Sequence, residues 1–253
     1  MARRAGSGGK GRMPEGRAAR AGQATRLRRS RGRGASSSRW LARQIRDPYV
    51  AAARNLGLRS RAAFKLAELD DRFHFLKPGA RVVDLGAAPG GWSRVAAERV
   101  GAAAKGGAAG RVVAIDLLEM EPIPGVVCLS LDFLSEEAPA RLREALEGQA
   151  DVVLSDMSAP ATGHTRTDHL RIMALLEAAY DFARVVLAPG GVFIGKVLRG
   201  GAERTLLDTL KRDFEEVRHA KPPASRKDSA EIYVVARGFR DRIADDDVGP
   251  VPG

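Results

Sequence analysis

Six short apolar runs are spread along this chain, and segments with helical spacing separate them. The runs are rich in valine, leucine and isoleucine and are almost uninterrupted, which is typical of strands buried on both faces of a sheet. They cover residues 81–85, 111–117, 126–131, 151–155, 191–197 and 231–237. This alternation predicts an α/β fold, with a parallel sheet covered by helices on both faces.

The segments between the runs complete the predicted architecture. Helical spacing is expected over residues 40–57, 60–72, 92–100, 136–147, 168–188 and 201–214. The last apolar run, 231–237, follows without room for another crossover helix, so we expect it to pair antiparallel with its neighbour. The pattern indicates a Rossmann-like open sheet in one domain of residues 38–240, with ligands at the carboxyl ends of its strands.

Charge is unevenly divided along the chain. Residues 1–37 hold eleven Lys or Arg and one acid, Glu15, whereas the rest of the chain holds 31 bases and 30 acids. This first segment has eight glycines and almost no large apolar residues, so we expect a disordered basic arm. Two interpretations stay open. The segment is a solvated linker or a result of start-codon choice, or it is an arm that binds RNA or a ribosomal particle. Residues 241–253 read as a short, flexible, acidic tail.

Composition excludes several classes of protein. One cysteine, Cys128, cannot form an intramolecular disulfide, and four scattered histidines lack the spacing of a structural zinc site, so no metal is expected. No run approaches the roughly 18 apolar residues that a membrane span needs. The apolar core of a signal peptide is also missing. We therefore expect a cytoplasmic protein with no membrane contact.

The turn after the first predicted strand has the features of a cofactor loop. Gly86, Gly90 and Gly91 let the backbone approach a ligand closely, and Trp92 follows at the start of a helix whose N–H groups are free. Pro89 supplies no N–H, which disfavours a dinucleotide. No Gly-Lys-Ser/Thr follows, so a P-loop is excluded.

Two acidic residues at the ends of the next strands extend this site. Asp116 ends the second strand, where it is placed to accept hydrogen bonds from ribose hydroxyls. Asp132 follows the third strand, where it is placed to accept a hydrogen bond from an adenine amino group. A single Asp at a strand end is usually a helix cap, but three such features after three successive strands favour a nucleoside-containing cofactor.

A family resemblance is carried by several motifs together. The run DLGAAPGGW (84–92), with SRAAFKL before it and SDM, GKV and EIYVVA after it, resembles the FtsJ-type RNA 2′-O-ribose methyltransferases over roughly residues 38–238. The resemblance implies the fold of S-adenosyl-L-methionine-dependent methyltransferases, a mostly parallel seven-stranded sheet with one late antiparallel strand. It also implies methylation of a uridine in 23S ribosomal RNA on the large ribosomal subunit, by a monomer.

The same resemblance implies a catalytic tetrad of Lys65, Asp156, Lys196 and Glu231. The reaction moves a methyl group from a sulfonium to a ribose 2′-oxygen, which must lose its proton. A lysine is a poor base at neutral pH, with a pKa of about 10.4 in water, but burial and a neighbouring cation make it a better one. We assign Lys196 as the base. Lys65 and Glu231 would position the ribose, and Asp156 would also border the methionine part of the cofactor.

Rival functions differ in what they predict. A nicotinamide oxidoreductase on this fold is disfavoured by Pro89 and by the lack of a second substrate domain. A non-catalytic RNA-binding assembly factor is disfavoured by the intact tetrad. The same chemistry on transfer RNA stays open.

Arginines of the leading helices are candidates to line the RNA path, namely Arg39, Arg43, Arg54, Arg59 and Arg61.

Overall fold

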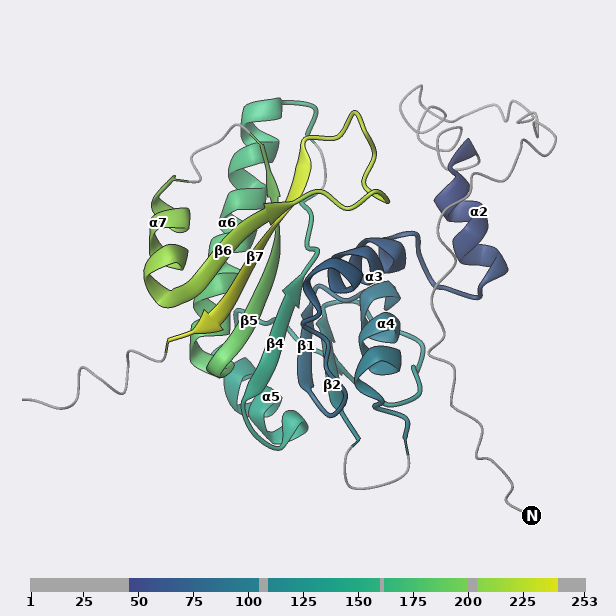
Figure 1. Ribbon diagram of the computed structural model, residues 1–253, viewed down its shortest axis with the longest axis vertical. Helices are drawn as coiled ribbons and strands as arrows, with labels where there is room; N and C mark the ends of the chain where they lie inside the picture. Colours follow the sequence, from purple (N-terminus) through teal and green to yellow (C-terminus); the bar gives the residue numbers. More distant parts are fainter. Residues whose placement is uncertain (1–45, 105–108, 160–161, 200–203, 241–253) are drawn as a thin grey trace, which may run out of the picture. The chain divides into compact units, whose positions relative to one another are not determined.

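A computed structural model describes residues 46–104, 109–159, 162–199 and 204–240 of the chain (Figure 1). The chain divides into two compact units, residues 1–51 and residues 52–253, and the whole sheet belongs to the second. The predicted arm (1–37) and tail (241–253) lie outside the described residues. Among the helices that are described, none has the length and apolar character needed to cross a bilayer.

Within the described ranges, seven strands form one sheet in the order β3-β2-β1-β4-β5-β7-β6. Their bounds are β1 Arg81–Leu85, β2 Arg111–Asp116, β3 Val126–Ser130, β4 Ala150–Ser155, β5 Leu187–Leu198, β6 Phe214–Ala220 and β7 Glu231–Phe239. All neighbouring pairs are parallel except those of β7, which runs antiparallel to both β5 and β6. The predicted mostly parallel sheet with a late antiparallel strand is confirmed.

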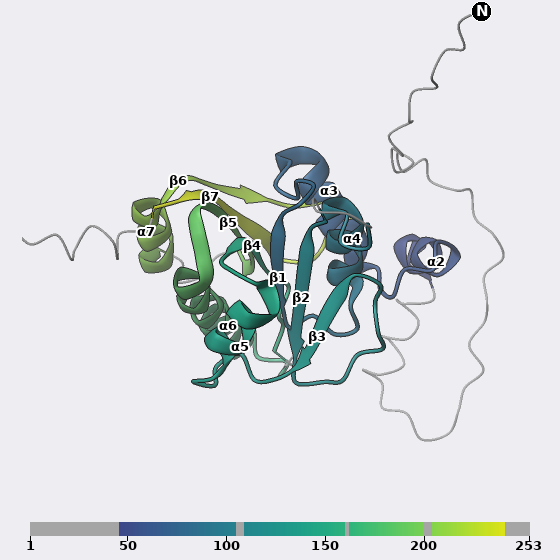
Figure 2. The ribbon, with the colours of Figure 1, turned by 90° about the horizontal axis from the view of Figure 1, so that it is seen from below.

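Helices cover both faces of the sheet (Figure 2). They are α3 Ala62–Phe73, α4 Gly91–Val100, α5 Ala138–Leu146, α6 Thr165–Val186 and α7 Arg204–Asp213, and α2 Pro48–Asn55 precedes them in the chain. Successive side chains of a strand point to opposite faces, and β1 shows the division. Asp84 faces α4, where it is bonded to Ser93, whereas Val83 and Leu85 join the cluster that α5, α6 and α7 cover.

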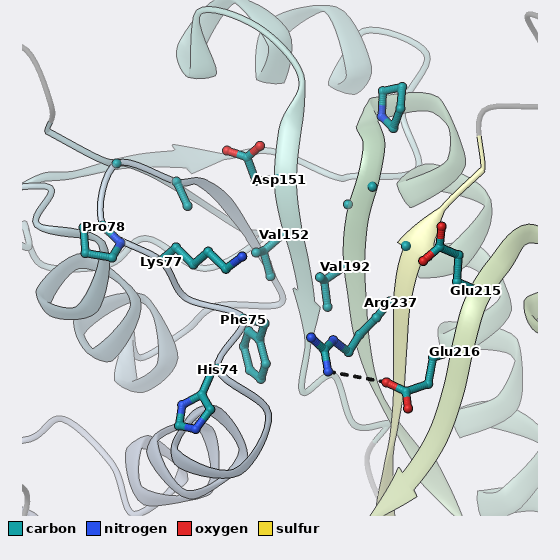
Figure 3. Close-up of a pocket in the computed structure, with 16 residues that line it drawn as sticks. His74, Phe75, Lys77, Pro78, Asp151, Val152, Val192, Glu215, Glu216 and Arg237 are labelled. Carbon is teal, nitrogen blue, oxygen red and sulfur yellow. Dashed lines mark hydrogen bonds and ion pairs between the residues drawn. The ribbon is translucent and has the colours of Figure 1, made fainter.

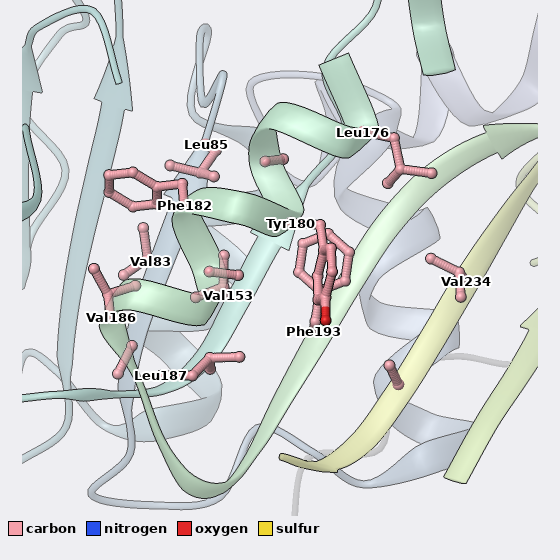
Figure 4. Close-up of a cluster of buried hydrophobic side chains, with 14 of the residues drawn as sticks. Val83, Leu85, Val153, Leu176, Tyr180, Phe182, Val186, Leu187, Phe193 and Val234 are labelled. Atoms are coloured by element: carbon pink, nitrogen blue, oxygen red, sulfur yellow. The ribbon is translucent and has the colours of Figure 1, made fainter. Parts of the chain in front are cut away.

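The larger core lies between the sheet and α6 (Figure 4). Tyr180 of α6 is fully buried, with its ring centroid 5.7 Å from that of Phe193 on β5 and 6.3 Å from that of Phe214 on β6. Its hydroxyl donates a hydrogen bond to Asp213 at the end of α7. The core therefore joins the parallel strands to the β6–β7 hairpin, which carries part of the site.

Strand β6 is the element that the apolar runs did not reveal. Its sequence, FEEVRHA, holds four titratable residues, and it follows α7 directly where the predicted helix 201–214 ends. An edge strand has one neighbour and one solvated side, so it tolerates charges that a central strand excludes. Strand β5 also begins earlier than predicted, at Leu187, and shortens the predicted helix 168–188 to Val186.

Candidate active site

The four predicted catalytic residues meet at the carboxyl-end edge of the parallel strands. Asp156 follows β4, and Lys196 lies near the end of the adjacent strand β5. Because β7 is antiparallel, its first residue, Glu231, pairs with Leu198 and reaches the same edge. Helix α3 brings Lys65 over this edge.

Contacts among the four side chains are direct. The Nζ atom of Lys65 lies 2.8 Å from Oε1 of Glu231 and 3.8 Å from Oδ2 of Asp156. The Nζ atom of Lys196 lies 3.0 Å from Oδ1 of Asp156 and donates a 2.7 Å hydrogen bond to its backbone oxygen. Asp156 therefore bridges both ammonium groups, and the structure brings together all four residues that the sequence predicts.

Burial and charge are balanced in this cluster. Lys65 and Lys196 are only 8% and 7% exposed, and two cations face two carboxylates. Buried ions are tolerated when they are paired and hydrogen-bonded. Burial by itself would raise the pKa of Glu231, but the Lys65 ammonium, with help from Lys196 and the Ser225 hydroxyl, holds it below its ordinary value. Glu231 is consequently a carboxylate at neutral pH.

A fifth residue, Tyr233, lies inside the tetrad and was not predicted from the sequence. Its hydroxyl donates to Oδ1 of Asp156 at 2.7 Å, lies 3.3 Å from Oε1 of Glu231, and accepts a 3.1 Å hydrogen bond from Lys65. Burial, together with the charges of Asp156 and Glu231, raises its pKa well above the ordinary value, so the phenol stays neutral. The strand period of two contained the signal, because Glu231 and Tyr233 share a face of β7.

Trp92 connects the tetrad to the glycine-rich loop. Its ring centroid is 5.6 Å from that of Tyr233, and its Nε1 atom donates a 2.8 Å hydrogen bond to the carbonyl of Ala62 at the start of α3. Trp92 is 3% exposed, so its ring is packed inside the protein, against Tyr233 and the start of α3.

The glycines of this loop are required by close approaches of other segments. Gly86 and Gly90 have φ values of +67° and +95°, which favour glycine. A Cβ on Gly86 would lie 2.3 Å from Cγ of Met157, the residue after Asp156. The loop is therefore packed directly against the strand end that carries the tetrad aspartate. At Gly91 a Cβ would lie 2.3 Å from the Ser60 hydroxyl oxygen.

Asp84 lies below the loop and is 1% exposed. Its Oδ2 atom accepts a 2.6 Å hydrogen bond from the hydroxyl of Ser93 in the first turn of α4. Burial raises the pKa of Asp84 to about 7, and the negative charge of Asp156 adds to this effect against the opposing hydrogen bonds from Ser93. A carboxyl that titrates near neutrality thus supports the start of the helix that the loop opens.

The two strand-end aspartates are bonded to nearby backbone. Asp116 accepts hydrogen bonds from the backbone N–H groups of Ala88, at 2.9 Å, and Leu118, at 2.8 Å. Asp132 is exposed and accepts one from the N–H of Leu134 at 3.0 Å. Asp116 thereby joins the end of β2 to the glycine-rich loop.

Apolar side chains stand exposed beside both aspartates. Leu117 and Leu118 are 71% and 67% exposed, and Leu134 is 62% exposed. Exposed leucines next to hydrogen-bond acceptors offer both apolar contact and polar partners to a flat ring with polar edges. The surroundings of Asp116 and Asp132 therefore fit an adenosine group.

Arg59, a candidate for the RNA path, is instead engaged with three carbonyl groups. Its guanidinium donates to the backbone oxygens of Pro89 at 3.2 Å, Glu121 at 2.8 Å and Pro122 at 2.8 Å. It therefore ties the segment before α3 to the glycine-rich loop and to the loop after β2.

A separate hollow of about 630 Å³ lies at the other ends of the strands, where the parallel strands begin (Figure 3). Lys77 and Pro78 before β1, Asp151 at the start of β4, and Arg237 near the end of β7 are among its lining residues. None of the predicted site residues lines it. The part of the chain that the structure describes also contains no group of three or more acidic, His or Cys side chains able to hold a metal ion.

Known proteins match this chain over the part that contains the sheet and the candidate site. The family of FtsJ-like methyltransferases matches residues 58–239. Ribosomal RNA large subunit methyltransferase E of Paramagnetospirillum magneticum is 65% identical over 206 residues, covering 81% of this chain and 84% of the relative. The protein of the same name from Xanthobacter autotrophicus is 61% identical over 215 residues, covering 85% and 84%.

Solved structures agree with these sequence relatives. A protein of Plasmodium falciparum, provisionally named a ribosomal RNA methyltransferase, is 31% identical, with a TM-score of 0.63. The similarity covers 72% of this chain and 98% of the other. The family match spans more than half of the sequence, and the relatives exceed 60% identity over most of it. The chain belongs to the FtsJ-like methyltransferase family.

Proposed function

We propose that this chain transfers a methyl group from S-adenosyl-L-methionine to the 2′-hydroxyl of a uridine in 23S ribosomal RNA, on the large ribosomal subunit. The observation that carries the proposal is the convergence of Lys65, Asp156, Lys196 and Glu231 in one buried, charge-balanced cluster beside the glycine-rich loop. The names of the relatives support ribosomal RNA as the substrate, and a ribosomal substrate places the reaction in the cytoplasm.

The residues around the loop fit the proposed cofactor. The backbone at Gly86, Gly90 and Gly91 and the first turn of α4 would hold its amino-acid part, with Trp92 and Asp156 at the border of the tetrad. Asp116 would accept from the ribose hydroxyls, and Asp132 from the adenine amino group. When bound, S-adenosyl-L-methionine supplies a methyl group activated by a positively charged sulfur.

Each tetrad residue has its own role in the rest of the reaction. With the target ribose at the cluster, Lys196 gives up its own proton and, as the neutral amine, takes the proton of the 2′-hydroxyl. The O–H bond and the bond between the methyl group and the donor sulfur would then break as the new O–C bond forms, leaving the sulfur uncharged. Asp156 lies 3.0 Å from the Lys196 amine and stabilises the ammonium that results. Lys65, held by Glu231 and Tyr233, has donors with which to orient the ribose oxygens.

The decisive experiment uses the full chain, S-adenosyl-L-methionine with a labelled methyl group, and large ribosomal subunits from cells that lack this enzyme. Label should enter 23S RNA at a single 2′-O-methyluridine, located by mass spectrometry of the digested RNA. Transfer to purified transfer RNA instead would move the proposal to that substrate. Binding to the subunit without transfer would identify a non-catalytic assembly factor.

A variant at the proposed adenine contact tests the cofactor assignment. Asp132→Ala should weaken S-adenosyl-L-methionine binding while leaving the fold intact, because Asp132 is exposed and its bond to Leu134 is local. Loss of a hydrogen bond to the cofactor should cost about 1–3 kcal/mol, or on the order of a tenfold rise in Kd. Unchanged affinity in a calorimetric titration would remove Asp132 from the site.

A further inference from the structure

At the carboxyl ends of the parallel strands, acidic residues gather on one side of the sheet and basic residues on the other. Residues 117–137, which run from the end of β2 through β3 to the start of α5, contain five acids and no Lys, Arg or His. All five acids are exposed, namely Glu119, Glu121, Asp132, Glu136 and Glu137. Arg59 reaches this region from the segment before α3, but its guanidinium is engaged with three carbonyls. This half of the edge, which includes the predicted adenosine contacts, repels a polyanion.

The other half of the edge carries cations. The loop between β6 and β7, residues 221–230, holds Lys221, Arg226 and Lys227 against a single acid, Asp228. Arg199 lies beside this loop, because its backbone N–H donates a 2.9 Å hydrogen bond to the carbonyl of Ala230. The side chains of Arg199 and Lys227 are exposed, and within the described residues no carboxylate pairs with either.

This loop is fixed to the catalytic centre at several points. Figure 1 shows it reaching from the β6–β7 hairpin towards α3. There the backbone N–H of Ala224 donates to Oε2 of Glu68 at 2.6 Å, and its carbonyl accepts from Arg61. Ser225 is 4% exposed, and its hydroxyl donates to Oε1 of Glu231 at 2.8 Å. The loop therefore borders the tetrad directly.

Internal bonds hold the loop in one conformation. The ammonium of Lys221 donates to the carbonyls of Ser229, at 2.6 Å, and Lys227, at 3.2 Å. The hydroxyl of Ser229 accepts from the N–H of Glu231 at 3.2 Å. A loop that is ordered before it meets its partner loses little entropy on binding. The backbone that carries its cations is thus held beside the tetrad.

We propose that the RNA strand reaches the tetrad over the β6–β7 side, and that Arg199 and Lys227 bind the phosphates that flank the target ribose. The proposal rests on the proposed function, since it takes an RNA ribose as the group at the tetrad. Arg199 follows Leu198, the residue of β5 that pairs with Glu231. Lys227 lies two residues beyond Ser225, which contacts Glu231. The cations therefore flank the reacting position, where phosphate contacts set the register of a strand.

The test compares two double variants that each remove two positive charges. Arg199→Ala with Lys227→Ala removes the proposed phosphate contacts. Lys77→Ala with Lys211→Ala is the matched control, because both lysines are exposed and lie near the opposite edge, before β1 and before β6. Binding is measured to large subunits and to protein-free 23S RNA over a salt series, and methyl transfer is measured as KM and kcat.

We expect the first double variant to raise the KM for subunits about tenfold or more. It should also make the log–log salt slope shallower by about two, one for each phosphate that a removed side chain would have neutralised. Its kcat at saturating RNA and its Kd for S-adenosyl-L-methionine should stay within about twofold of wild type. The charge-keeping pair Arg199→Lys with Lys227→Arg should restore most of the binding, and the control pair should match wild type.

The outcomes separate this proposal from the proposed function. If wild type binds 23S RNA but transfers no methyl group, the proposed function fails, and the binding comparison still decides the role of the loop. If wild type transfers the methyl group while the first double variant keeps its KM and salt slope, the loop is not the path of the RNA. An equal weakening in the control pair, or a weakening on subunits that is absent on protein-free RNA, would also overturn the proposal.

Discussion

Each charged side chain of the tetrad has a partner of opposite charge, and this pairing decides what a single substitution does. Lys196 contacts Asp156 through both the carboxylate and the backbone oxygen. Removing Lys196 leaves Asp156 with Lys65 at 3.8 Å and with the Tyr233 hydroxyl at 2.7 Å. The carboxylate keeps partners, so a variant at Lys196 should fold and can be tested for chemistry.

Lys196→Ala should abolish, or nearly abolish, methyl transfer and leave S-adenosyl-L-methionine binding largely unchanged. The amine acts on the ribose hydroxyl and not on the methyl donor, so the loss should fall on the chemical step. Lys196→Arg should not rescue, because a guanidinium stays protonated at any accessible pH. Single-turnover rates of the alanine variant within a few-fold of wild type would show that Lys196 is not the base.

Asp84 gives the folded protein a pH dependence of its own. Burial raises the pKa of this carboxyl from its ordinary 3.8 to about 7. Between those values the native state binds more protons than the unfolded state, so stability falls as pH rises from about 4 to 7 and levels off above 7. Glu231, whose pKa is lowered, acts in the opposite direction, with stability lost as pH falls below about 4.5.

The free energy of unfolding of Asp84→Asn should therefore increase, relative to that of wild type, as pH rises. This relative gain between pH 4 and pH 8 is at most about 4 kcal/mol, because the pKa is shifted by about three units and each unit corresponds to 1.36 kcal/mol. Chemical denaturation at several pH values measures it, with the exposed Asp181→Asn as the matched control. The contribution of Glu231 cancels because both variants contain it. A difference that does not change with pH would contradict the titration of Asp84.

How much of the site could be read from the sequence differs between residues. Lys65, Asp156, Lys196 and Glu231 were predicted because each lies in a motif that carries the family resemblance. Tyr233 was not predicted, since a tyrosine within EIYVVA looks like an ordinary strand residue. The role of Arg59 was also missed, because backbone carbonyls of three segments are its partners, and no side-chain pattern records them.

At the scale of elements, Arg59 holds together the loops that would surround the cofactor. Arg59→Ala should raise the Kd for S-adenosyl-L-methionine about tenfold, because the loops at Pro89 and at Glu121–Pro122 would have to be ordered on binding. Arg94→Ala is the matched control, since its guanidinium makes one 3.0 Å bond to the carbonyl of Gly57 in the same segment. Calorimetry that gives the two variants equal affinities would argue against a clamp.

The elements themselves were predictable where burial made their sequences apolar. The runs at 81–85 and 151–155 correspond closely to β1 and β4, and buried strands need such runs because both of their faces are covered. Strand β6 escaped because its charged residues are acceptable only at an edge, and edge position is a property of the whole sheet. Sequence patterns indicate which residues are buried, whereas the order of strands in the sheet depends on contacts between distant segments.

At the scale of the whole molecule, the net charge is concentrated in residues 1–37. The net charge of the chain is +11, but residues 38–253 hold 31 bases and 30 acids and are nearly neutral. Long-range attraction to RNA must therefore come from residues 1–37, and local contact from clusters such as the β6–β7 loop. The two contributions can be separated, because one depends on total charge and the other on position.

Deleting residues 1–37 should leave thermal stability and cofactor affinity almost unchanged, because the deletion removes no residue of the sheet or of the predicted site. Binding to large subunits should weaken, chiefly at low salt, where contacts to phosphates release the most counterion free energy. If about five of the eleven basic side chains contact phosphate at once, the log–log salt slope should become shallower by roughly four to five units. The methylated position should not move, because phosphate contacts do not read sequence. Full-length and truncated chains are compared on large subunits across a salt series, and the modified nucleotide is mapped for each. Identical slopes would show that the arm takes no part in binding, and a shifted methylation site would show that it helps to choose the target.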